Sequence, residues 1–184
     1  MNKLNNFFLQ IFFYFLFFAT LVAVHLAVIK ALPYPFNKIN FLIIFIIFIL
    51  FVFGKRLAMF ASLIIGLILD FYYFPSLGIN TVSLLLTLLL TNFLLVNFLT
   101  DKSLYSFLAL TSTAYFSFIA SLHIFYYVVS LGGGLEANFV FNRYFFNSKI
   151  YGWLFSLIIA TIIFYIFNYI NKRYKPFFLI KGGR

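Results

Sequence analysis

Ionisable side chains that could carry out chemistry are few in this chain of 184 residues. It contains three carboxylates, Asp70, Asp101 and Glu136, two histidines and no cysteine. General acid–base catalysis and metal binding both need several such groups to meet in one place. The carboxylates fall in different predicted loops, and no group of His, Asp and Glu has the spacing of metal ligands. The sequence therefore predicts no catalytic residue, no metal and no cofactor, and the lack of cysteine excludes disulfides and thiolate chemistry.

Asp70 differs from the other two carboxylates because it is embedded in an apolar run. An ionisable group in such a segment is costly and is by default a candidate for function. Three interpretations are open. Asp70 could be a polar anchor that holds the following turn through backbone N–H groups, or pairs with a cation of a partner. It could end a helix at the water interface, or it could be a proton or ligand site.

A turn follows Asp70 after a few residues. Pro75 and Gly78 bracket this turn, and both residue types favour turns conformationally. Asn80 and Thr81 then supply capping groups for the next helix. The sequence thus predicts a helix, a tight turn and a second helix around Asp70.

Small residues recur at every fourth position before Asp70. On a helix, Ala58, Ser62 and Gly66 form one face that leads to the carboxylate. Such a face lets a neighbouring helix approach closely, which favours association in a bilayer. Four other predicted helices carry similar stripes, formed by Ala19, Ala23 and Ala27; Ser83, Thr87 and Thr91; Ala109, Thr113, Ser117 and Ser121; and Gly152, Ser156 and Ala160. These stripes predict a compact bundle, whereas the segment 41–53 has none and is expected at its periphery.

The composition is that of an integral membrane protein. Hydrophobic residues make up 65% of the chain, charged residues 9%, and the mean hydropathy is +1.11. The net charge of +10 does not indicate nucleic-acid binding, because the basic residues lie at the ends of apolar runs, where they anchor helices. The basic tail 171–184 is expected to be attracted to anionic membrane lipid. The sequence is expected to form one transmembrane domain, 1–184.

Six apolar runs approach the roughly 20 residues that a spanning helix needs. They lie near 7–29, 36–53, 57–74, 81–99, 104–131 and 150–170. The second and third have short apolar cores and are separated only by Gly54, Lys55 and Arg56, which predicts a tight helical hairpin; a re-entrant hairpin is the alternative. With six spans, one side of the membrane holds nine Lys and Arg and the other four. The positive-inside rule then places both termini in the cytoplasm.

Both histidines fall in predicted spans. His123 lies near one edge of a small-residue stripe and is expected to face the bundle interior as a satisfied polar residue or, less simply, as a ligand. His25 lies opposite the Ala19, Ala23 and Ala27 stripe and is interpreted as a snorkelling residue near the outer interface. The outer segment 132–149 is rich in aromatic residues, which favours an interfacial position or a docking edge.

The segment 60–89 resembles the signature of the MreD family, the small membrane proteins of the bacterial rod-shape machinery. The resemblance rests on Gly66, three apolar residues and Asp70, then a short variable stretch and Leu77, Gly78, Ile79 and Asn80, which open a leucine-rich helix. Chain length and helix count also fit. The aromatic residues directly after Asp70 depart from the family pattern, in which smaller residues are expected.

The resemblance implies a non-enzymatic scaffold in the bacterial cytoplasmic membrane. Its implied partners are the bitopic protein MreC, the glycosyltransferase RodA with a transpeptidase, and, indirectly, the MreB filament. The substrate-binding components of energy-coupling-factor vitamin transporters also have six short spans, and such a component is the alternative function. That function needs a cavity with convergent polar groups, for which His123, Tyr126, Tyr127, Glu136 and Asn138 are the candidates.

Overall fold

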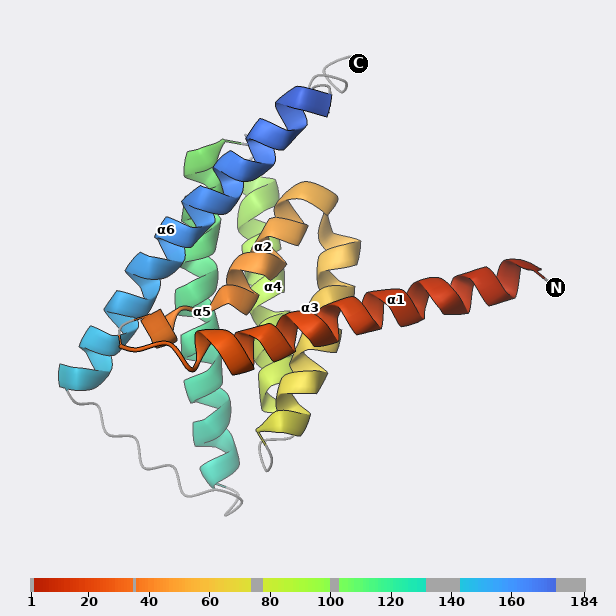
Figure 1. Ribbon diagram of the computed structural model, residues 1–184. Helices are drawn as coiled ribbons and strands as arrows, with labels where there is room; N and C mark the ends of the chain where they lie inside the picture. Colours follow the sequence, from red (N-terminus) through yellow and green to blue (C-terminus); the bar gives the residue numbers. More distant parts are fainter. Residues whose placement is uncertain (1, 35, 74–77, 100–102, 132–142, 175–184) are drawn as a thin grey trace.

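The computed structural model describes residues 2–34, 36–73, 78–99, 103–131 and 143–174, and within them it contains helices and no strand. The fold is an all-α bundle, as the sequence predicts (Figure 1). A π-helical turn, His25–Ile29, continues α1, and a short 3-10 helix, Phe36–Lys38, precedes α2. The α-helices are α1, Asn2–Val24; α2, Phe41–Phe53; α3, Lys55–Tyr72; α4, Ile79–Asn97; α5, Leu104–Leu131; and α6, Arg143–Tyr174.

Within the residues that the structure describes, four segments are long and apolar enough to cross a membrane: Phe12–Ile29, Ile79–Asn97, Leu104–Leu131 and Asn147–Ile170. The chain is therefore a membrane protein. α2 has only 13 residues, which extend about 20 Å at 1.5 Å per residue, less than the hydrocarbon thickness of about 30 Å. It starts later than the predicted 36–53 because the side chain of Asn40 accepts a hydrogen bond from the Ile43 N–H and caps the helix there.

α2 and α3 form the predicted tight hairpin. Gly54 joins the two helices with a φ of 90°, a value that favours glycine. Its N–H donates to the carbonyls of Ile49 and Leu50, so the end of α2 is satisfied within the turn. Lys55 and Arg56 therefore begin α3 directly after the turn, and the two charges lie at the tip of the hairpin.

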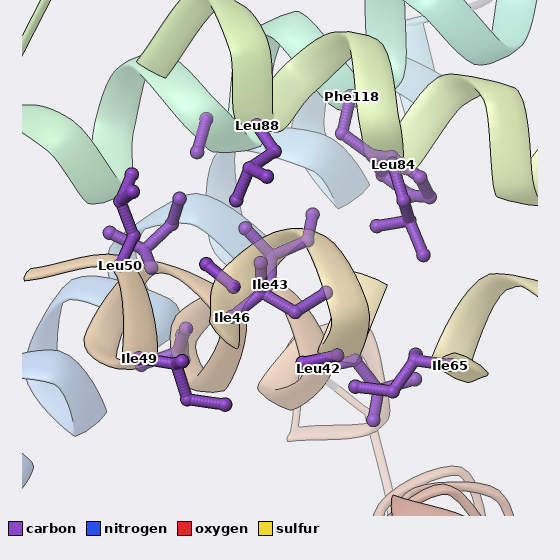
Figure 2. Close-up of a cluster of buried hydrophobic side chains, with 14 of the residues drawn as sticks. Leu42, Ile43, Ile46, Ile49, Leu50, Ile65, Leu84, Leu88 and Phe118 are labelled. Atoms are coloured by element: carbon purple, nitrogen blue, oxygen red, sulfur yellow. The ribbon is translucent and has the colours of Figure 1, made fainter. Parts of the chain in front are cut away.

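The expected peripheral position of the segment 41–53 is wrong, because α2 lies at the centre of the core. Eight of its 13 residues are buried, and it packs against α3, α4, α5 and α6. Figure 2 shows Ile43 and Ile46 of α2 together with Leu84 and Leu88 of α4. A helix that is apolar on all faces is suited to burial on all faces. Branched aliphatic side chains make this contact by interdigitation, without a stripe of small residues.

The predicted small-residue stripes differ in their outcome. Those of α3, α4 and α6 are buried, whereas on α1 Ala23 and Ala27 are exposed and on α5 only Ser121 of its stripe is buried. α1 contacts α3, and the apolar residues that it buries are the larger Phe18 and Val22 instead. Figure 1 shows why: α1 runs crosswise to α4 and α5, and its N-terminal half extends beyond the bundle. A crossing helix touches its neighbour over a short patch, so a long stripe has no partner there.

In Figure 1 the hairpin at Gly54 and the end of α4 lie at one end of the bundle, and the start of α4 lies at the other, which the charge count assigns to the outer side. The π-helical turn, the 3-10 helix and the start of α6 lie between these two ends. The cytoplasmic placement of both termini stays a prediction.

Candidate functional site

Asp70 is buried and fully engaged in hydrogen bonds to the start of α4. The residue is 1% exposed. Oδ1 accepts from the backbone N–H of Asn80 at 2.8 Å and from Asn80 Nδ2 at 3.0 Å. Oδ2 accepts from the backbone N–H of Thr81 at 3.0 Å and from the Thr81 hydroxyl. Both oxygens are therefore satisfied by two consecutive residues.

These donors belong to the first turn of α4, where backbone N–H groups have no partner within the helix. Gly78 is the N-cap residue of α4 and has a φ of 88°. Because glycine has no side chain, it cannot accept a hydrogen bond from these N–H groups. Asp70, which comes from α3, takes over that role and places its negative charge at the positive end of the α4 dipole. The arrangement ties the end of α3 to the beginning of α4. It agrees with an anchoring role, and the burial does not fit a residue that ends a helix in water.

Gly66 lies one turn before Asp70, at the closest approach of α3 and α4. A Cβ added to Gly66 would lie 2.5 Å from the Cα of Thr81, which is closer than non-bonded carbon atoms approach one another. Thr81 thus packs on the glycine with its backbone and donates to the carboxylate with its hydroxyl. The other small residues of the α3 stripe, Ala58 and Ser62, are fully buried, and the Ser62 hydroxyl donates to the Met59 carbonyl.

The stripe on α6 packs against the segment before α2. A Cβ on Gly152 would lie 2.7 Å from the Lys38 carbonyl oxygen. Ser156 Oγ accepts a hydrogen bond from the Asn40 N–H at 3.4 Å, and Ala160 is fully buried. Gly152 and Ser156 therefore hold the connection from α1 to α2 against α6.

The structure contradicts the interpretation of His25, whereas His123 has a partly buried position on α5. His25 is 4% exposed and lines a cavity, so its interpretation as a snorkelling residue is wrong. The wider π-helical turn begins at His25, and no sequence pattern signals it. His123 is half-buried on α5 and is not among the described residues that line the cavities at this end of the bundle. Burial of His25 follows from the crosswise position of α1.

Several predicted candidates do not meet in one place. Of the aromatic pair proposed for a ligand pocket, Tyr126 lines the cavity, whereas Tyr127 is exposed. Pro75, Leu77, Asp101, Glu136 and Asn138 lie outside the described residues. Within the part of the chain that the structure describes, no group of three or more His, Asp and Glu side chains could hold a metal ion. The site that the structure brings together is the junction of Gly66, Asp70, Asn80 and Thr81.

Comparison of the chain with protein-family models, curated proteins and solved structures found no match. Sequence reasoning identified Gly66, Asp70 and Asn80 but missed the pairing of Asp70 with Thr81. The available signal was the position of Asn80 and Thr81 in the first turn of the following helix, where free N–H groups attract a carboxylate.

Proposed function

We propose that this protein is a non-enzymatic membrane scaffold of the bacterial cell-shape machinery, in the manner of MreD. It resides in the cytoplasmic membrane and organises peptidoglycan synthesis through contacts with an MreC-like bitopic protein. Through that protein it associates with a RodA-like glycosyltransferase and its transpeptidase, and indirectly with the MreB filament.

The observation that carries this proposal is the internal use of the signature residues. Gly66, Asp70 and Asn80 join α3 to α4, and the hydrogen-bonding capacity of the buried carboxylate is consumed by Asn80 and Thr81. A carboxylate engaged in this way supports the shape of the bundle. The structural role of Asp70 supports a protein whose function is to bind partner proteins through its surface.

The N-terminal half of α1 provides such a surface, because it extends away from the bundle (Figure 1). Phe12 and Phe13 of this helix are exposed. Lipid tails and apolar side chains are similarly apolar, so burial alone does not drive two helices together in a membrane. Their association depends on how well their side chains pack. A single-pass helix of a bitopic protein is a suitable partner for a projecting helix of this kind.

The second candidate function, the substrate-binding component of a small-molecule transporter, is favoured by one observation. A cavity of about 260 Å³ opens at the end of the bundle opposite the Gly54 hairpin, and polar and aromatic side chains line it. Its volume approaches that of small-molecule sites, roughly 300 Å³ and above. The two functions predict different consequences of losing the protein.

Depletion of the protein from its rod-shaped host tests the function. We expect the cells to widen and become round within a few generations, because wall synthesis loses its organisation along the cell body. Cell width is measured by phase-contrast microscopy, with re-expression of the wild-type chain as the control. Rods of unchanged width that stop growing and are rescued by a vitamin supplement would contradict the scaffold and support the transporter.

A further inference from the structure

The cavity at the outer end of the bundle has an electrostatic character that the scaffold function does not require. It consists of two adjoining hollows of about 260 and 190 Å³. Both hollows share Lys30, Asn40 and Lys149 as lining residues, so they are parts of one site. The lining comes from the segment after α1, the start of α2, and helices α3, α4, α5 and α6.

Three lysines from three separate segments line this site. Lys30 follows the π-helical turn, Lys38 ends the 3-10 helix, and Lys149 lies near the start of α6. No Asp or Glu is among the described residues that line either hollow. Desolvation and, secondarily, the charge of Lys38 lower the pKa of Lys30, which indicates that the ammonium groups repel one another. An anion in the cavity relieves this repulsion.

His25 provides a second, independent observation. Its imidazole is 4% exposed and lines the larger hollow, and its Nδ1 has no hydrogen-bond partner within the described residues. Buried polar atoms are nearly always hydrogen-bonded, so such an atom calls for an explanation. His25 also opens the π-helical turn, in which the Lys30 N–H donates to the His25 carbonyl at 3.2 Å. π-helical turns occur frequently at functional sites, and this one places His25 and Lys30 at the same cavity.

We propose that this cavity binds a phosphate group through Lys30, Lys38, Lys149 and His25. A phosphate offers several acceptor oxygens, which suits lysines that converge from different segments as point charges. The side-chain amide of Asn40 also lines the larger hollow and can donate as well. Leu84, Phe118 and Leu122 form an apolar wall beside it, which can contact the carbon skeleton that carries the phosphate. The phosphate belongs either to a lipid headgroup or to a soluble phosphate ester.

Binding is tested on the full-length protein in a neutral detergent. Binding of inorganic phosphate is measured as a rise in the midpoint of thermal unfolding. Co-purifying phospholipid is detected by native mass spectrometry. The test variant is Lys30→Gln/Lys38→Gln. The matched control is Lys55→Gln/Arg56→Gln, which removes the same charge at the opposite end of the bundle. Potassium chloride at equal ionic strength controls for screening. The midpoint without added phosphate reports whether each variant is folded.

The proposal predicts binding that falls at least about tenfold in the test variant and stays unchanged in the control variant, because two charge-assisted contacts are lost. Saturable stabilisation by inorganic phosphate identifies a soluble phosphate group as the source. Retention of phospholipid without a response to inorganic phosphate identifies a lipid headgroup. Equal binding by both variants, or binding of neither probe to the wild-type protein, would overturn the proposal. The scaffold function does not depend on this site, so its own test is unaffected.

Discussion

Replacement of Asp70 by asparagine is expected to lower the free energy of unfolding by about 3 kcal/mol. An amide has one oxygen and one NH₂ group in place of two acceptor oxygens. Its NH₂ group must therefore face the donors of either Asn80 or Thr81, which need an acceptor. Two of the four hydrogen bonds are lost and buried donors remain unmatched. For a chain of this length the midpoint of thermal unfolding should fall by about 10 °C. The measurement is thermal unfolding of the purified protein in detergent.

Asn97→Ala is the matched control. Asn97 Nδ2 donates to the Phe93 carbonyl on the exposed surface of α4, so its removal should change the midpoint little. Thr81→Val removes only the hydroxyl donor to Asp70 and should cost less than Asp70→Asn. The double variant should lose less than the sum of the single losses, because both substitutions break the same network. Additive losses, or an unchanged midpoint for Asp70→Asn, would show that the junction does not anchor the two helices.

Replacement of Gly66 by alanine is expected to destabilise the protein by about 2 kcal/mol. The new Cβ would lie 2.5 Å from the Cα of Thr81, so α3 and α4 must move apart and weaken the hydrogen bonds of Asp70. Helix propensity alone predicts the opposite sign, a gain of about 0.8 kcal/mol for alanine over glycine. The sign of the change in the unfolding midpoint therefore decides between close packing and intrinsic propensity.

A larger side chain at the same position sharpens the comparison. Gly66→Leu should lower the yield of folded protein as well as the midpoint, whereas Ala120→Leu adds similar bulk on the exposed face of α5 and should be tolerated. A stabilised Gly66→Ala variant, together with equal tolerance of both leucine variants, would refute close packing of α3 on α4.

Much of the fold could be predicted from the sequence because apolar runs and helix-breaking residues mark the helices. The position of Asp70 was informative because a carboxylate in an apolar segment must find donors. The central place of α2 could not be predicted in the same way. In a membrane, lipid and protein interior are both apolar, so hydropathy does not distinguish a lipid-facing helix from a buried one. An all-apolar helix fits either environment.

The candidate cavity was missed for related reasons. The small residues of α1 predict a packing face opposite His25, whereas the crossing of α1 buries Phe18, Val22 and His25. Lys30 and Lys38 lie in the connection between α1 and α2, whereas Lys149 lies more than 100 residues later in α6, so their convergence depends on how that connection packs against α6. Only the occurrence of lysines near the predicted outer ends of several segments pointed in this direction.

The central claim, that the protein acts as a scaffold for wall synthesis, is tested most directly by affinity purification. The tagged chain is purified from its own membranes in mild detergent, and the accompanying proteins are identified by mass spectrometry, with an untagged strain as the control. The scaffold function predicts recovery of an MreC-like bitopic protein together with cell-wall synthases. Recovery of a membrane coupling protein with two ATPases, and no wall synthase, would contradict it.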